Sequence, residues 1–478
     1  MGKIPSLKTI AEPGKEVKVC RECDVAVVGG GPGGIGAAVS AARNGADTVL
    51  IERYGYLGGM GTGGLVTIIP NLSDISGAQK IAGLQQEWID RLDTREAAAY
   101  PPRSVWGSDD ERLVSYWNER VFFYVRLDRV IYSALIDAEV SKCVLADMVN
   151  EAGVKTYLHS WCTRPIVDHN TVKGIIFESK SGRQAVLAKV IIDCTGDGDL
   201  LPFTPAEFEQ DMDPNLRIAN LALCFWVDGV NYIKMDDFRH AHPQKYQEMM
   251  QEVANKGGQS SFFRSNLKNQ ENIVWFHNRY PNSGQTDVEE LTRVEFLGRQ
   301  SMLITHDFFK KNVPGFENSF IVLSAPQLGT RGSRRVHGDY RLTAKDLASS
   351  EYFSDTIAVF PDLDRGEESM KHPLQYIPYR TLLPTGVENL LVACRAFSSD
   401  KMVNNYFNLI PHCVAFGEAA GTAAALAIDQ GASVRTVNVE LLRKRLLKQN
   451  VLLQNANPEA PRKASKSEER YEAPSFRG

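Results

Sequence analysis

Short continuous apolar runs alternate with helical patterns along most of this chain. Residues 25–28, 48–51, 190–193 and 389–393 are apolar runs that end at turns, which is typical of strands buried on both faces of a parallel sheet. The Ala-rich stretch 37–44 follows the first run and predicts a helix. The pattern therefore predicts an α/β fold with a Rossmann-like core.

A glycine-rich turn joins the first apolar run to the predicted helix. Gly29, Gly31 and Gly34 have the spacing that lets backbone approach a pyrophosphate at the positive N-terminus of a helix. Glu52 closes the second apolar run, at the separation where an acidic side chain accepts hydrogen bonds from a ribose. These features predict a dinucleotide site.

Three further segments indicate which dinucleotide is bound. The glycine-dense stretch 53–64 offers bare backbone to a large planar group. The run 190–193 leads into a Cys-Thr-Gly-Asp-Gly-Asp turn at 194–199, and the run 389–393 leads into Cys394-Arg395 before a small-residue helix expected to open at 417–424. A nicotinamide-binding fold needs only the first glycine turn.

Together these segments resemble the FAD-dependent oxidoreductases of the glutathione-reductase-like two-dinucleotide superfamily. The chain looks closest to the broad FAD-dependent oxidoreductase family, which is distantly akin to fumarate reductase and succinate dehydrogenase flavoproteins. The resemblance covers about residues 22–450 and includes 326–340, 377–380 and 411–413. It implies bound FAD and redox chemistry, and little about the substrate, because members of the family differ widely in what they act on.

The resemblance also implies which residues contact FAD. In chain order they are Gly29, Gly31, Pro32, Gly33, Gly34, Glu52, Arg53, Gly58, Gly59, Met60, Thr62, Cys162, Thr195, Gly196, Asp197, Arg395, Gly417, Ala420 and Gly421. The backbone near Cys162 is expected beside the adenine. Two positions depart from the family pattern: Gly332 stands where the family usually has Glu, and Cys394 where it usually has Gly. The chemistry facing the cofactor is expected to differ there.

The chain is expected to form a discontinuous FAD-binding domain with an inserted α+β cap, or substrate domain. The FAD-binding parts are 22–72, 125–204 and 373–453, the helical insertion is 73–124, the cap is 205–372, and a polar tail occupies 454–478. The tail has too little apolar content to fold alone. It is either free or an arm docked on a partner subunit, so a homo-oligomer stays open.

Periodicity predicts further elements within these parts. Helices are expected at 125–152, 236–256, 287–311 and 439–453, and strands at 155–160, 163–168, 172–178, 221–227, 273–276 and 320–323. Gly153 is expected to end the first of these helices. Residues 168–170, Asp-His-Asn, are expected to form a hairpin turn.

The resemblance suggests a substrate lodged between the flavin and the cap. Arg334, Arg335, His337 and Tyr340 form the densest polar cluster there. An arginine could clamp a carboxylate or carbonyl, and His337 or Tyr340 could move a proton. The alternative is that both arginines brace the cap against the FAD-binding domain through ion pairs.

Other candidates lie around the last predicted strand. Tyr379-Arg380 and residues 404–406, Asn-Asn-Tyr, flank that strand, and His412 precedes the final small-residue helix; Tyr379 and His412 are the catalytic candidates among them. A histidine titrates near neutral pH, so His412 is the first choice for proton transfer and His337 the second, although a structural role for a lone histidine is the commoner outcome. Backbone amides of residues 417–420 could stabilise negative charge on a reduced flavin.

Composition narrows the class of partner and compartment. Lysine and arginine number 54 and aspartate and glutamate 58, so the net charge of -4 gives no footprint for nucleic acid. No apolar run approaches the roughly 18 residues of a membrane span. Eight cysteines in 478 residues do not make a disulfide framework and indicate reduced thiols in the cytoplasm. The Cys20–Cys23 pair lacks further ligands nearby, so no metal site is expected.

The leading hypothesis is an FAD-dependent dehydrogenase that transfers hydride between flavin and a small organic molecule. The hydrogen is removed or added next to a carbonyl, or an alcohol or amine is oxidised. Without a second nicotinamide fingerprint, the external electron donor or acceptor is unidentified. Two alternatives are a protein with structural FAD and a partner-binding cap, and a flavin-dependent RNA-modifying enzyme, which the near-neutral charge argues against.

Overall fold

The computed structural model describes residues 10, 12, 14, 16–281 and 284–453, and its largest sheet has seven strands. The order is β8-β2-β1-β11-β10-β9, with β21 beside β11. The strands span Lys18–Val28 (β1), Thr48–Ile51 (β2), Lys155–Tyr157 (β8), Trp161–Asp168 (β9), Thr171–Ser179 (β10), Gly182–Asp193 (β11) and Leu390–Val392 (β21). β8, β2, β1, β11 and β21 are parallel, and β9 to β11 form an antiparallel meander.

The register brings the predicted turns to one edge of this sheet. Val28 is level with Ile51 on β2 and with Asp193 on β11, and Asp193 is level with Val392 on β21. The four strands therefore end together, and the turns that follow them lie side by side. This is the edge at which open α/β sheets bind their ligands.

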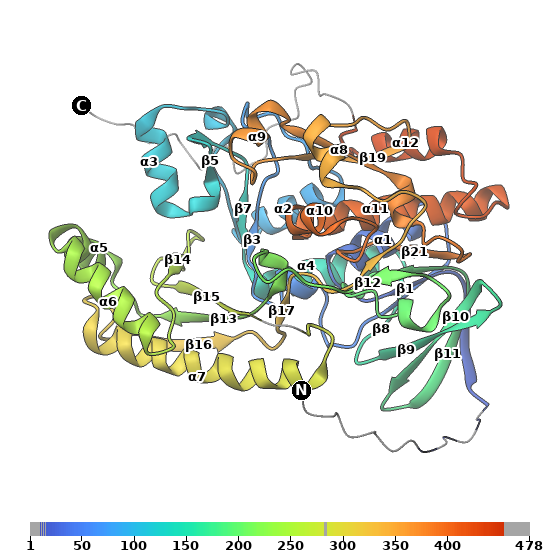
Figure 1. Cartoon of the computed structure of the whole chain (residues 1–478), viewed down its shortest axis with the longest axis horizontal. Helices are drawn as coiled ribbons and strands as arrows, with labels where there is room; N and C mark the ends of the chain where they lie inside the picture. The colour runs from blue at the N-terminus through green and yellow to red at the C-terminus, as the bar shows by residue number, and fades with distance from the viewer. Residues whose placement is uncertain (1–9, 11, 13, 15, 282–283, 454–478) are drawn as a thin grey trace.

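Two helices rich in small residues pack tightly against each other over this sheet (Figure 1). They are α1 (Pro32–Arg43) and α11 (Ile410–Gln430). A Cβ atom on Gly417 would lie 1.9 Å from the Gly33 carbonyl oxygen, and one on Gly421 would lie 2.1 Å from the Ala37 oxygen. Glycine is needed at these two positions because the backbones of the two helices nearly touch.

A second sheet of five antiparallel strands lies in the middle of the chain. Its order is β14-β15-β13-β16 with β17 beside β13, spanning Phe262–Arg264 (β14), Val274–Pro281 (β15), Asn220–Asp228 (β13), Phe320–Ser324 (β16) and Gly329–Thr330 (β17). Helices α5 (Tyr232–Ala241), α6 (Pro243–Asn255) and α7 (Val288–Asn312) cover its outer side (Figure 1). Phe225 and Phe276 stack at 4.8 Å and pack with Phe309 of α7.

The remaining strands and helices surround these two sheets. They are β3 (Ile68–Ile69), α2 (Leu84–Asp93), β4 (Ala98–Ala99), α3 (Glu111–Arg120), β5 (Val125–Arg126), β6 (Arg129–Val130), β7 (Ala134–Ile136), α4 (Ala138–Glu151), β12 (Phe208–Glu209), β18 (Arg335–Val336), α8 (Ala344–Ser349), β19 (Thr356–Pro361), α9 (Glu367–Lys371), β20 (Leu374–Pro378), α10 (Lys401–Tyr406) and α12 (Val439–Lys448). Residues 73–124 hold α2 and α3 as expected, together with β4.

The expected helix at 125–152 is wrong over its first half. Residues 125–136 form β5, β6 and β7, and the helix α4 begins after Asp137. Asp137 caps α4 by accepting hydrogen bonds from the amides of Glu139 and Val140. Leu127 and Asp128 have positive φ angles, which turn the chain between β5 and β6. The expected end at Gly153 is confirmed, with φ of 79° there.

Two other helices are shorter than expected. The pattern at 236–256 is two helices, because Pro243 starts α6 and the residue before a proline avoids helical geometry. The last helix ends at Lys448 instead of continuing to 453. The hairpin at 168–170 is confirmed, since β9 pairs antiparallel with β10 across His169, whose φ is 54°. The polar tail at 454–478 lies outside the described residues.

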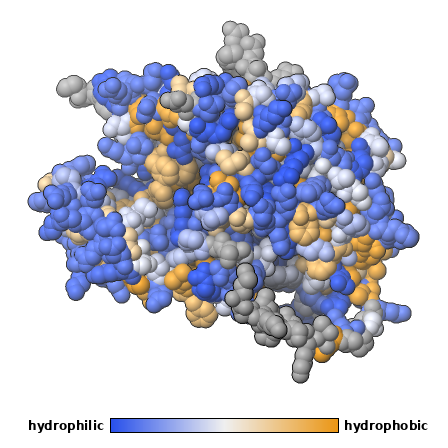
Figure 2. Space-filling model, in the orientation of Figure 1, coloured by the Kyte–Doolittle hydropathy of each residue, from blue (hydrophilic) through white to orange (hydrophobic). Residues whose placement is uncertain are grey.

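In the described part of the chain, no helix is long and apolar enough to cross a bilayer. Figure 2 shows a face on which hydrophilic residues predominate and hydrophobic ones gather in small groups. Such scattered exposure is ordinary for protein surfaces.

Candidate functional site

The glycine turn after β1 is held by close backbone approach. Gly29 has φ of 95°, and a Cβ atom there would lie 2.6 Å from the Cys194 carbonyl oxygen. A Cβ atom on Gly34 would lie 1.7 Å from the Gly29 oxygen. Any larger residue at either position would push the start of α1 away from the sheet edge. The fold itself therefore requires these two glycines.

Gly31 is a glycine that the protein does not require for its own packing. Its φ is -73°, which any residue adopts, and the nearest atom to an added Cβ is the Gly59 Cα at 4.0 Å. A ligand lying against the bare Cα explains the absence of a side chain. Gly31 is the N-cap of α1, so this ligand would meet the positive end of the helix, as a pyrophosphate does.

Glu52 lies beside this turn with its carboxylate fixed. One oxygen accepts a hydrogen bond from the Gly30 amide at 2.6 Å and the other from the Tyr54 amide at 2.7 Å. Burial raises the pKa of Glu52, although both amides oppose the shift. A carboxylate has about four acceptor sites, so capacity remains for a ribose hydroxyl.

An aromatic patch lies next to Glu52. The Arg53 guanidinium carbon is 5.1 Å from the ring centre of Trp161 and 4.9 Å from that of Tyr54. Trp161 is 56% exposed and precedes Cys162, the residue expected near the adenine. Sequence reasoning missed Trp161. The available signal was a large aromatic residue at the start of a strand that mixes polar and apolar side chains.

The turn after β11 is organised by a buried carboxylate. Asp193 accepts hydrogen bonds from the amide and hydroxyl of Thr195 at 3.0 and 2.7 Å, and burial raises the pKa of this carboxyl. Gly196 then turns with φ of 90°. Asp197 pairs with Arg395 at 2.7 Å, and Arg395 also donates to the Thr330 hydroxyl. The third and fourth predicted segments are thus tied together, and β17 joins them.

The second glycine-dense stretch connects the turn to the five-stranded sheet, which lies within the predicted cap 205–372 and is called the cap sheet from here on. The Gly58 amide donates to the Gly30 oxygen at 2.8 Å, and a Cβ atom on Gly59 would lie 3.0 Å from the Gly31 Cα. The Met60 sulfur is 3.9 Å from the Cβ position of Gly329 on β17. This stretch therefore lies between the predicted pyrophosphate site and β17. Thr62 is fully buried and donates to the Leu57 oxygen, so its side chain faces the interior.

The last predicted contacts require a correction. Gly417, Ala420 and Gly421 lie inside α11, which begins at Ile410. Amide groups in the middle of a helix are already bonded to carbonyls one turn earlier, so those of 417–420 cannot stabilise a flavin anion. Gly417 and Gly421 pack against α1 instead.

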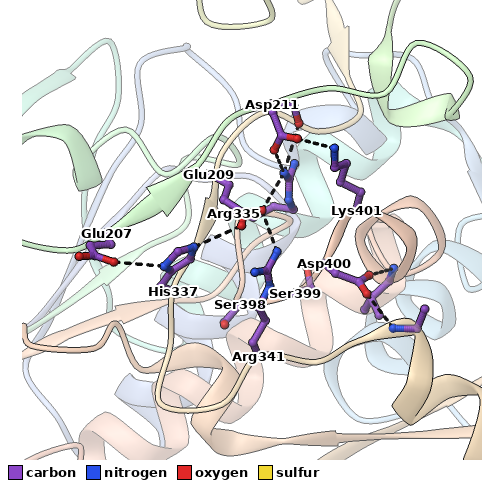
Figure 3. Close-up of polar contacts among 12 residues, drawn as sticks. Glu207, Glu209, Asp211, Arg335, His337, Arg341, Ser398, Ser399, Asp400 and Lys401 are labelled. Atoms are coloured by element: carbon purple, nitrogen blue, oxygen red, sulfur yellow. Dashed lines mark hydrogen bonds and ion pairs between the residues drawn. The ribbon is translucent and has the colours of Figure 1, made fainter.

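The predicted catalytic cluster 334–340 does not face a single point. Arg334 donates to the Asp197 oxygen at 3.0 Å and pairs with Asp199 at 3.1 Å, next to the turn after β11. Arg335 points elsewhere: it is 1% exposed and donates to Asp211 at 2.6 Å and to Glu209 at 3.2 Å (Figure 3). Arg335 is therefore a bracing residue, but its two partners lie in the same predicted part, 205–372. Arg334 is the arginine that pairs with the predicted FAD-binding part 125–204, through Asp199.

The histidine and the tyrosine that follow Arg335 also have protein partners. His337 lies between Glu207 and Glu209, at 3.4 and 3.5 Å (Figure 3). Tyr340 donates to Asp346 at 2.9 Å, and burial together with that carboxylate raises the pKa of Tyr340 to about 12. Neither contact points to the glycine turn.

Tyr379 and His412 lie in the core. The Tyr379 hydroxyl donates to the Val434 oxygen at 2.7 Å. His412 is 1% exposed, its ring lies 4.2 Å from that of Phe360, and its Nδ1 accepts the Leu409 amide. Burial lowers the pKa of His412 to about 3, so this ring is neutral at physiological pH. Its placement supports the structural alternative.

The inner face of the cap sheet is the face turned away from α7. It carries polar residues that sequence reasoning did not select. On β15, Phe276 faces α7, so the alternating Trp275, His277 and Arg279 point away from that helix. Arg331 follows β17 directly. The signal available in the sequence was a histidine and an arginine two residues apart in a strand that is otherwise apolar except for Asn278.

A model of one protein family matches most of the chain. The match covers residues 24–446, and the family is described as FAD dependent oxidoreductase. The chain belongs to this family. No curated protein matches it.

Solved structures similar to this FAD-dependent oxidoreductase are distant. A geranylgeranyl bacteriochlorophyll reductase-like protein from Thermoplasma acidophilum is 14% identical, with TM-score 0.43 over 90% of this chain and 84% of the other. A p-nitrophenol 4-monooxygenase from Pseudomonas putida is 12% identical, with TM-score 0.44 over 92% and 91%. A myxobacterial chondrochloren halogenase is 11% identical, with TM-score 0.41 over 89% and 78%.

The glycine turn after β1 and Glu52, together called the cradle, fit the cofactor of the family, FAD. Gly31 leaves bare backbone at a helix N-terminus, and Glu52 keeps acceptor capacity beside it. These two would hold the pyrophosphate and a ribose. The glycine-dense stretch 53–64, called the Met60 stretch from here on, would cover the cofactor on the side of the cap. Among the described residues no group of three or more His, Cys, Asp or Glu side chains could hold a metal ion.

Proposed function

We propose that this FAD-dependent oxidoreductase transfers hydride between a small organic substrate and its flavin. The reaction is dehydrogenation or reduction next to a carbonyl, or oxidation of an alcohol or amine. Bound FAD supplies the hydride acceptor or donor. The observation that carries the proposal is the polar inner face of the cap, which begins beside Met60, where β17 meets the glycine-dense stretch.

His277 is the candidate for proton transfer on this face. Its ring stacks on Trp275 at 5.4 Å, which fixes its orientation. Burial, with the charges of Arg331 and Arg279, holds the pKa of His277 well below its usual value. The ring is therefore neutral at physiological pH and can accept a proton or a hydrogen bond from a substrate hydroxyl.

A small cavity lies beside the two tryptophans of this face. Trp226 and Trp275 line this cavity with Ile68 and Leu135, between the cap sheet and β3 and β7.

We propose that the enzyme is cytoplasmic, because all eight cysteines are free thiols and a reducing compartment keeps them so.

The test is an anaerobic screen of the flavin-loaded protein. Pooled alcohols, amines, saturated ketones and acids are mixed with the oxidised enzyme, and loss of the visible flavin absorbance reports hydride transfer. At least one class is expected to bleach the flavin, and His277→Ala should slow the bleaching without loss of FAD. If every pool fails with a fully flavin-loaded protein that dithionite does reduce, the proposal is wrong.

A further inference from the structure

Three arginines meet at one end of the inner face of the cap. Arg279 on β15 is level with Ala222 on β13, and Ala222 is level with Gly329 on β17, two residues before Arg331. Arg217 lies in the turn that enters β13. All three guanidinium groups are close enough to act on each other, since Arg217 and Arg279 both lower the pKa of Arg331 and Arg217 also lowers the pKa of Arg279.

The negative charge near these arginines is already engaged. Asp364 is the carboxylate that acts on Arg331, but it pairs with Arg217 at 3.2 Å and with Arg126 at 3.8 Å. Arg217 also donates to backbone oxygens of α10. Arg279 and Arg331 form no hydrogen bond or ion pair with any other described residue. The cluster therefore has two cations without a counter-charge.

Such an arrangement is unfavourable without a ligand. Burial and neighbouring like charge both disfavour a cation, and together they lower the pKa of Arg331 to about 10. Buried charges in proteins are normally paired, and because Arg279 is exposed to solvent the cost falls on Arg331. A guanidinium group presents a rigid fork of donors that matches the two oxygens of a carboxylate or phosphate. An anionic group between Arg279 and Arg331 would relieve the repulsion.

We propose that the substrate of this enzyme is a small organic anion whose carboxylate or phosphate group binds between Arg279 and Arg331. This inference rests on the proposed function, because it takes the inner face of the cap as the substrate site. The phosphates of FAD do not account for the cluster, because the predicted pyrophosphate position is at Gly31, on the far side of the Met60 stretch. His277, two residues before Arg279 on β15 and acted on by the charges of both arginines, would then meet the substrate close to its anionic group.

The test measures anion binding to the flavin-loaded protein through the change in flavin absorbance. Acetate, benzoate and inorganic phosphate serve as probes, and benzyl alcohol is the neutral analogue of benzoate. At least one anion is expected to bind saturably, and benzyl alcohol more weakly. Arg279→Gln and Arg331→Gln should each weaken that binding by about tenfold or more, as expected when a charge-assisted hydrogen bond is lost.

Arg293→Gln is the matched control. It removes the same charge from the cap, but Arg293 is exposed on α7 and pairs with Glu290 at 2.6 Å. Anion binding to this variant should be unchanged. The preferred probe distinguishes carboxylate from phosphate as the bound group.

Three outcomes would overturn the inference. They are no spectral response to any of the three anions, equal binding of benzyl alcohol and benzoate, and equal weakening by Arg293→Gln and Arg331→Gln. Failure of the proposed function is a separate result, because anions would still perturb a flavin that no organic compound reduces. Conversely, bleaching by neutral compounds alone would keep the function and reject the anionic substrate.

Discussion

Replacing Arg335 by methionine separates the two roles considered for it. Arg335 is almost fully buried and holds Asp211 and Glu209. Both carboxylates keep another partner, Lys401 for Asp211 and Arg341 for Glu209. The change therefore removes three charge-assisted hydrogen bonds, two to these carboxylates and one to the Asp211 backbone oxygen, without leaving an unpaired buried charge. At about 1.5–3 kcal/mol for each bond and with partly exposed partners, the free energy of unfolding should fall by about 2–4 kcal/mol.

The assay combines urea unfolding, FAD content and the rate of flavin reduction on one preparation. The bracing role predicts a lower urea midpoint and a normal reduction rate for each folded, flavin-loaded molecule. Arg341→Met is the control, since its single pair is partly exposed and such pairs contribute about 0–1 kcal/mol. A stable Arg335→Met protein that binds FAD but does not turn over would refute the reasoning and return Arg335 to the catalytic residues.

Three further predictions concern the cofactor site, the electron partner and pH. Gly31→Ala should lower FAD content with little loss of stability. Gly34→Ala should destabilise the fold itself, because the Cβ atom of the new alanine would clash with the Gly29 oxygen. Equal melting temperatures of the two variants would contradict this prediction. With one dinucleotide fingerprint, micromolar NADPH should not reduce the flavin rapidly, and stopped-flow mixing tests this. Burial raises the pKa of Glu418 to about 8. The folded chain therefore retains a proton that the unfolded chain releases at about pH 4.3. Between these two pH values the free energy of unfolding falls by about 1.4 kcal/mol for each pH unit of increase. Glu418→Gln should therefore gain stability over the wild type from about pH 5 to 8 and gain no more above pH 8; parallel unfolding profiles would refute the assignment.

The cradle could be predicted from the sequence because its signals are local. Gly29, Gly31 and Gly34 act within one turn, and Glu52 follows on the adjacent strand. Parallel strands that end level with one another then bring the other turns to the same edge, which needs no knowledge of side chains. The family resemblance rested on these same segments.

The surroundings of the site could not be predicted in the same way. The partners of Arg335 lie 124 and 126 residues away, so nothing in its own neighbourhood separates a clamp from a brace. The helical periodicity of 125–136 reflects apolar residues that are buried in small sheets instead. The inner face of the cap depends on register between β13, β15 and β17, which only the fold determines.

The central claim is that the inner face of the cap is the flavin-facing substrate site. A crystal structure of the oxidised enzyme with FAD tests it most directly. The account predicts the pyrophosphate against Gly31 and the flavin ring at the Met60 stretch, with its open side toward His277 and Arg331. A flavin ring on the far side of the seven-stranded sheet, or one separated from the cap face by packed protein, would contradict it.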